Sequence, residues 1–252
     1  MRTPRMDGPW IWVVLFVVLT FGVTFWGQLF AGDDSVRRPT FSYSPSPEVE
    51  PVATIPPRIK GWKAVESQKY ALAYDVPSAW RVRSVGLLVG FEPRAGRQMA
   101  LASSVAAWRE DHCATERVSQ LAGTGFQQYS TGKPADVARN AADKWTVDAY
   151  TPEHGNPPAV RYSGPKPVKV SGVKGFHVQA DAKPTPGGKS CLPPRAVVHV
   201  VALPGRATGK TTVFVIWSDQ GVPGAVPPRE LKRILASLRS AGPKAGASTA
   251  PG

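Results

Sequence analysis

The hydrophobic pattern of the chain begins with one long apolar run and continues with many short ones. Residues 9–31 contain no charged side chain. About 20 apolar residues in a helix span the hydrocarbon core of a bilayer, and a single segment satisfies its backbone there only as a helix. Trp10, Trp12 and Trp26 lie near the two ends of the run, and tryptophan favours the headgroup region. The pattern predicts one transmembrane helix over 9–31.

The charges beside this run indicate its orientation. Arg2 and Arg5 precede it, whereas Asp33 and Asp34 follow it directly, with Arg37 and Arg38 further along. Positive residues favour the cytoplasmic side. We therefore expect a single-pass protein of the cell membrane, with residues 1–8 in the cytoplasm and everything after the helix outside the cell.

A cleaved secretory signal is the alternative interpretation of the same run. Signal sequences have a shorter apolar region of about 7–15 residues and end in a small-x-small site. Here the run is longer, and residues 29–31 (Leu-Phe-Ala) fit such a site poorly. No Cys follows the run directly, which excludes a lipoprotein anchor. Both interpretations place the remaining chain outside the cytoplasm.

Composition divides the remaining chain into three parts. Residues 32–59 are rich in Pro and Ser without apolar periodicity, which is typical of an extended linker. Residues 241–252 are mostly Ala, Gly, Pro and Ser, which predicts a disordered tail. Residues 60–240 are expected to form one globular domain.

Short runs of strand character fill most of this domain. Runs of β-branched and aromatic residues with period two, or nearly continuous apolar runs, are typical of strands. The runs Ala196–Leu203 and Thr211–Trp217 are nearly continuous in apolar residues and predict central, buried strands. The expected strands are Trp62–Val65, Tyr70–Val76, Arg81–Val85, Leu87–Phe91, Met99–Val105, Pro167–Ala182, Ala196–Leu203 and Thr211–Trp217.

Helical spacing occurs in three places. A weak signal covers Glu116–Ala122, and a stronger one covers Pro134–Tyr150, where Ala and Trp recur at spacings of three and four. A third helix opens at Pro227-Pro228, since proline is tolerated in the first turn. Together with the strands, these helices predict an α+β fold, a mostly antiparallel sheet with helices packed on its faces.

The third helix is amphipathic. Leu231, Ile234, Leu235 and Leu238 form its apolar stripe, whereas basic residues lie mostly off that stripe. The basic residues are Arg229, Lys232, Arg233 and Arg239. Such a face is ordinarily solvated, and contact of Arg229, Lys232 and Arg233 with lipid or a polyanion is the functional alternative.

The formal net charge of +13 belongs to the domain. Residues 58–239 contain 26 Lys and Arg against 13 Asp and Glu, an excess that equals the charge of the whole chain. A basic surface attracts polyanions such as anionic lipids or acidic cell-wall polymers. Nucleic acid is not expected, because the sequence shows neither a reading helix nor a stacking platform.

Cys113 and Cys191 predict a disulfide, because paired cysteines outside the cytoplasm are usually oxidised. Two buried thiols, or a Cys113 nucleophile beside His112, are the alternatives. His177 and His199 lie on separate expected strands and meet if those strands pair. A metal site needs a third ligand, which the sequence does not supply, so neither metal nor cofactor is expected.

One loop imitates a phosphate-binding motif. Residues 205–211 read Gly-Arg-Ala-Thr-Gly-Lys-Thr, with three residues between the glycines where the motif needs four, and a strand follows. We interpret this segment as a hairpin loop.

Two segments resemble a known family. Residues 74–80, Tyr-Asp-Val-Pro-Ser-Ala-Trp, resemble the opening of small extracytoplasmic domains of actinobacteria, and Leu231–Arg239 is similar to their closing helix. The chain resembles actinobacterial membrane-anchored extracytoplasmic domains with a PsbP-like (LpqN-like) α/β/α sandwich. The resemblance implies a binding or adaptor module without a shared catalytic site. The lipidated Cys of the lipoproteins is replaced here by the apolar run.

These observations favour a membrane-tethered binding or scaffolding domain, without enzymatic activity, for an envelope protein or an anionic polymer. Two alternatives stay open. A hydrolase or transferase would need a deep pocket that gathers His177 or His199 with a carboxylate and a hydroxyl. A lipid or small-molecule carrier would need a connected apolar cavity between sheet and helix.

Overall fold

A computed structural model describes residues 53–91, 99–114, 119–152, 155–185 and 191–242. The chain divides into two compact units, 1–46 and 47–252, and all described residues belong to the second. The expected helix over 9–31, with Trp10, Trp12 and Trp26, lies outside the described residues. Within the described residues, neither helix is long and apolar enough to cross a membrane.

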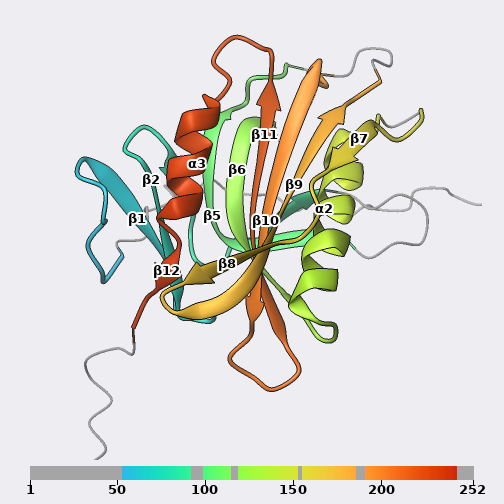
Figure 1. Cartoon of the computed structure of the whole chain (residues 1–252). Helices are drawn as coiled ribbons and strands as arrows, with labels where there is room; N and C mark the ends of the chain where they lie inside the picture. The colour runs from blue at the N-terminus through green and yellow to red at the C-terminus, as the bar shows by residue number, and fades with distance from the viewer. Residues whose placement is uncertain (1–52, 92–98, 115–118, 153–154, 186–190, 243–252) are drawn as a thin grey trace, which may run out of the picture. The chain divides into compact units, whose positions relative to one another are not determined.

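A twisted antiparallel sheet forms the centre of the domain (Figure 1). Among the described residues it has nine strands in the order β3-β5-β6-β11-β10-β9-β7, with β4 beside β5 and β8 beside β9. The strands are β3 (Arg81–Val82), β4 (Val89–Phe91), β5 (Ala100–Glu110), β6 (Gln120–Tyr129), β7 (Ala159–Tyr162), β8 (Lys166–Val170), β9 (Val173–Lys183), β10 (Arg195–Pro204) and β11 (Thr211–Gln220).

One face of this sheet carries a short second sheet and a helix. The second sheet consists of β1 (Trp62–Ser67), β2 (Leu72–Pro77) and β12 (Arg239–Ser240), and the helix is α3 (Pro228–Ala236). Leu231 and Ile234 of α3 pack with aromatic and β-branched side chains of the central sheet into one hydrophobic core. The expected apolar stripe of this helix is thus buried, and Pro228 occupies its first turn as expected.

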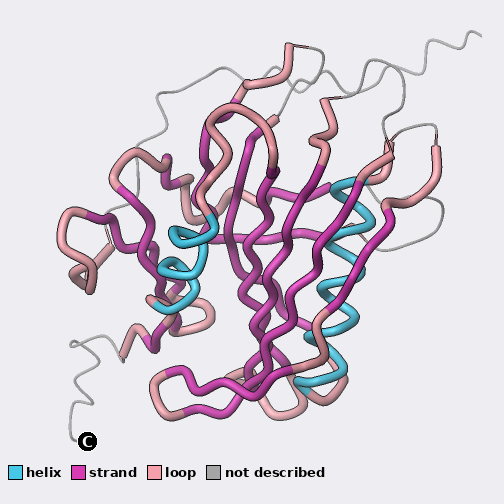
Figure 2. The backbone as a smooth tube through the Cα atoms, turned by 45° about the horizontal axis from the view of Figure 1, so that its top comes forward, coloured by secondary structure: helices cyan, strands magenta, loops and turns pink. Residues whose placement is uncertain are grey.

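The other face carries α2 (Pro134–Tyr150), whose bounds match the helix expected from sequence. Small residues let the helix approach the sheet closely, and Ala138, Ala141 and Ala142 are fully buried. Trp145 stacks on Trp217 of β11 with ring centroids 5.0 Å apart. The α+β class with a mostly antiparallel sheet and helices on its faces is therefore confirmed (Figure 2).

Two local predictions were wrong. The helix expected over Glu116–Ala122 is a strand in its described part, because β6 begins at Gln120 and pairs with both β5 and β11. Pairing on both sides overrides a weak helical period. The single run Pro167–Ala182 is two strands, β8 and β9, joined by Ser171-Gly172. Both turn residues have positive φ, 45° and 85°, which suits a tight hairpin.

The last residues of the expected linker, 56–59, contact the folded domain. The backbone amides of Arg58 and Ile59 donate to the Asp75 carboxylate at 2.7 and 3.1 Å. Arg239 donates to the Pro56 carbonyl at 3.0 Å. Arg239 was expected on the helix and lies instead in β12, where its side chain is buried against Asp75. The folded domain therefore extends to the N-terminal side of residue 60.

Candidate functional site: a basic cleft beside the closing helix

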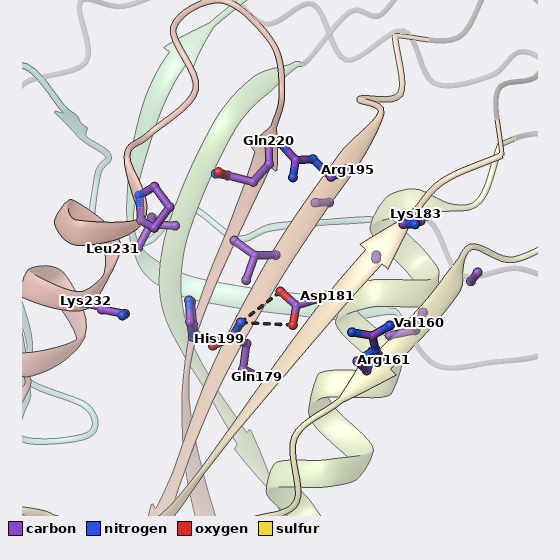
Figure 3. A pocket seen from close by; sticks show the side chains of 15 residues that line it. Val160, Arg161, Gln179, Asp181, Lys183, Arg195, His199, Gln220, Leu231 and Lys232 are labelled. Carbon is purple, nitrogen blue, oxygen red and sulfur yellow. Dashed lines mark hydrogen bonds between the residues drawn. The ribbon is translucent and has the colours of Figure 1, made fainter.

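The face of the central sheet that carries α3 also forms a cleft. Beside the helix, the same face of β10, β9 and β7 lines a cavity of about 770 Å³ (Figure 3). Leu231 and Lys232 of α3 form one side, and Arg161 of β7 forms the other. The volume of the cleft is large enough for a small ligand, since small-molecule sites usually measure about 300–1,000 Å³.

Strand alternation gives this cleft a polar floor. Along β9, the even-numbered residues from Phe176 to Ala182 pack toward α2. The odd-numbered residues therefore point to the opposite face. These are His177, Gln179, Asp181 and Lys183, and the last three line the cleft.

Two cations lie on adjacent strands at one end of the floor. Ala182 pairs with Ala196 across β9 and β10, so the next residues, Lys183 and Arg195, lie on opposite sides of the same rung. Both side chains line the cleft and are exposed. Like charges opposite each other destabilise a sheet, so an anion bound between them would relieve their repulsion.

Two further cations border the same cavity. Arg161 extends from β7, and Lys232 extends from α3 on the other side (Figure 3). Within the described part of the chain, Arg161, Lys183, Arg195 and Lys232 form no ion pair with a carboxylate. The lining therefore has an excess of positive charge, and an anionic ligand would be attracted to it.

Asp181 is the carboxylate among the described lining residues. The side-chain amide of Gln179 donates to both of its oxygens, at 2.9 and 3.1 Å. These two bonds leave further lone pairs of the carboxylate open to the cleft. The site thus offers strong hydrogen-bond acceptors beside its cations.

His177 and His199 come together as the strand pattern suggested. Their rings are stacked, and His177 Nε2 lies 3.2 Å from His199 Nδ1. Burial, then the neighbouring charges of His177 and Lys232, lowers the pKa of His199 to about 4. Burial and the charge of Lys166 lower the pKa of His177 as well. Both rings are therefore neutral at pH 7, and one donates a hydrogen bond to the other.

The cleft does not assemble an acid–base relay from its described groups. Asp181 accepts a hydrogen bond from the side chain of Gln179, and the hydroxyl of Ser163 accepts one from the backbone N–H of Gln179. Neither group is hydrogen-bonded to His199, whose Nδ1 faces His177. Within the described residues, no group of three or more His, Cys, Asp or Glu side chains is arranged to hold a metal ion.

The basic residues predicted on α3 separate in the structure. Lys232 lines the cleft. The guanidinium of Arg233 lies over the Trp62 ring, 4.7 Å from its centroid. Arg229 is exposed in the first turn of the helix. Of the three, Lys232 alone contributes to the cleft.

Cys113 and Cys191 form the expected disulfide, with their Cα atoms 5.9 Å apart. A Cys113 nucleophile beside His112 is therefore excluded while this bond is intact. His112 lies 3.9 Å from a carboxylate oxygen of Asp219 instead. The segment 205–211 is a hairpin loop between β10 and β11, as expected, closed by a bond from the Gly205 amide to the Lys210 carbonyl.

Most of the cleft was not found by sequence reasoning. Arg161, Lys183, Arg195, Gln179 and Asp181 come from three strands and share no sequence motif. One signal was available on β9, where a polar series at odd positions alternates with an apolar series from Phe176 to Ala182. Such alternation marks a strand with one solvent-facing side, although the pattern does not indicate a pocket.

The fold and the cleft together define the class of protein. It is an α+β domain built around an antiparallel sheet, with a basic cleft on one face of that sheet. Residues 55–243 match the family described as "Domain of unknown function (DUF8017)", and the chain belongs to this family. No curated protein matches the sequence.

The fold has distant likenesses among solved structures. It is similar to the Ran-binding protein Mog1p of Saccharomyces cerevisiae, with 16% identity over 71% of this chain and 95% of that one, at a TM-score of 0.37. It is similar to the PsbP protein (CyanoP) of Synechocystis sp. PCC 6803, with 12% identity over 72% and 94%, at 0.36. A protein of Bacteroides thetaiotaomicron VPI-5482 shows 10% identity over 71% and 48%, at 0.33. No functional statement rests on likenesses at these TM-scores.

Proposed function

We propose that this protein is a membrane-tethered, extracytoplasmic binding domain whose ligand is an anionic component of the cell envelope. The observation that carries the proposal is the basic cleft, where Lys183 and Arg195 lie on adjacent strands without a carboxylate partner among the described residues. An anion from outside the domain would reduce the repulsion between these two cations.

Two observations support the location. The apolar run over 9–31 has the length and the flanking charges of a single-pass anchor. The pairing of Cys113 with Cys191 suits an oxidising compartment, because disulfides are rare in the cytosol. A protease-cleavable tag at the C-terminus should be cut from outside intact cells. A tag that is cut only after lysis would contradict the location.

The binding proposal is tested with the full chain, purified in an uncharged detergent. We expect it to bind polyglutamate but not polylysine, with an affinity that falls as salt rises from 20 to 200 mM, since screening weakens exposed charge pairs. Titration calorimetry measures this directly. Anion binding that ignores salt, or no binding to polyglutamate at low salt, would contradict the proposal.

A matched pair of variants locates the binding. The double substitution Lys183→Ser and Arg195→Ser removes two charges from the cleft. Lys169 and Lys174 are also opposite each other on adjacent strands, and both are exposed. They alternate with Val168 and Gly175 and so point to the face away from the cleft. Lys169→Ser with Lys174→Ser therefore removes the same charge elsewhere, and we expect the cleft pair to weaken binding far more.

A further inference from the structure

We infer that the cleft binds an acidic saccharide, with an acidic group between Lys183 and Arg195 and hydroxyl groups on Asp181. This inference rests on the proposed function and specifies the chemistry of its ligand. It follows from the order of charges and acceptors across the floor of the cleft.

The acidic group belongs at the end where the cations converge. Lys183 and Arg195 share a rung, and Gln220 of β11 pairs with Arg195 on the same rung. Arg161 lies two residue positions nearer the middle of the floor, on the same face and opposite Asp181. Guanidinium and ammonium groups bind carboxylates and phosphates with charge-assisted hydrogen bonds. One acidic group at this end would therefore meet donors from three strands.

The middle of the floor favours a different group. Asp181 lies two residues from Lys183 along β9, about 7 Å away on the same face. Its negative charge would repel a second acidic group placed there. A hydroxyl group is instead attracted, because an ionised carboxylate acts only as an acceptor. Gln179 holds the carboxylate in place through two hydrogen bonds, so its orientation is fixed before a ligand arrives.

The rest of the lining suits the neutral faces of sugar rings. Val197, Pro228 and Leu231 form apolar parts of the cleft between its charged groups. Ligand sites commonly combine a largely apolar surface with a few well-placed polar groups. A ligand with one acidic group followed by a neutral polyhydroxylated body fits the cations at one end and Asp181 in the middle. A uniform polyanion fits less well, because Asp181 would repel its central charges.

The experiment compares four probes on the full chain by titration calorimetry. Glucuronate supplies one carboxylate together with hydroxyls, and its methyl ester supplies the hydroxyls without charge. Triglutamate supplies the charges without hydroxyls, and glucose 6-phosphate distinguishes a phosphate from a carboxylate as the acidic group. We expect at least one acidic sugar to bind at least roughly tenfold more tightly than both the methyl ester and triglutamate, which is about the effect of one charged hydrogen bond.

Variants then assign the two subsites. Asp181, Lys183 and Arg195 are all exposed, so their substitution leaves the core intact. Lys183→Ser with Arg195→Ser should lower the affinity for the acidic sugar by roughly tenfold or more. Lys169→Ser with Lys174→Ser should leave that affinity nearly unchanged. Asp181→Asn should weaken the binding of the acidic sugar but strengthen the binding of triglutamate. The amide keeps one neutral acceptor in place of two charged ones, so its bonds to hydroxyls are weaker, and it no longer repels an anion.

The outcomes separate this inference from the proposed function. If triglutamate and the acidic sugars bind with equal affinity, the ligand is not a saccharide, although the anion-binding function stands. The same conclusion follows if Asp181→Asn changes the affinity for both ligands in the same direction. If the methyl ester binds as tightly as its parent acid, the proposed acidic subsite is wrong. Failure of every anionic probe, polyglutamate included, would overturn both.

Discussion

Asp75 in β2 and Arg239 in β12 form a buried ion pair between residues that are 164 positions apart. The Arg239 guanidinium donates to Asp75 Oδ1 at 2.7 Å, and the two side chains are 4% and 0% exposed. Asp75 also accepts the amides of Arg58 and Ile59, and Arg239 donates to the Pro56 carbonyl. This pair therefore fastens both ends of the folded domain to its first hairpin.

Asp75→Ala should destabilise the domain strongly, because it leaves Arg239 buried without its partner. We expect a loss of about 3–5 kcal/mol in the free energy of unfolding, measured by urea denaturation. Arg81→Ala is the control, since Arg81 pairs with Glu110 at 3.4 Å and its side chain is 53% exposed. That change should cost less than about 1 kcal/mol. Similar losses for the two variants would contradict the role of burial.

Stability should fall as the pH falls from about 6.5 to about 4. The pKa of His199 is lowered to about 4, so in this window the unfolded chain takes up a proton more readily than the folded one. The lowered pKa of His177 acts in the same direction. The loss over the window is at most about 3 kcal/mol for His199. His199→Gln should flatten the pH profile of the unfolding free energy, and an unchanged slope would contradict this assignment.

Removing the disulfide should lower the stability of the oxidised protein. The bond between Cys113 and Cys191 closes a loop with a sequence separation of 78, which corresponds to about 4 kcal/mol in the chain-entropy account. We expect Cys113→Ser with Cys191→Ser to unfold at a correspondingly lower urea concentration. Reduction of the unchanged protein should shift its midpoint to nearly the same value. A double variant as stable as the oxidised protein would contradict the expectation.

Gly123→Ala should be destabilising because β6 passes directly beneath the Trp217 ring. A Cβ atom at Gly123 would collide with the ring of Trp217, which is buried in the core between the sheet and α2. Overpacking of this kind costs about 1–3 kcal/mol. Gly164→Ala is the control, since nothing lies within 4 Å of the added atom, and it should change stability by less than about 0.5 kcal/mol. Thermal unfolding of the two variants compares them directly.

Elements with a strong local signal could be predicted from sequence, whereas those that depend on neighbouring strands could not. Helix α2 was predicted with its correct bounds, because its Ala and Trp residues repeat at the helical period over Pro134–Tyr150. Strand β6 was not predicted, because residues such as Gly123 and Gly125 have low strand propensity. Pairing on both sides and packing under Trp217 decide its conformation.

The sequence by itself determined the class of fold, the closing helix and the two cysteines that form the disulfide, because each depends on local periodicity or on a pair of rare residues. Only the tertiary structure decided that Arg161, Asp181, Lys183, Arg195 and Lys232 line one cleft. These residues come from three strands and a helix, and their meeting depends on strand order and register. Those are set by the packing of the whole core, which no single segment of the sequence records.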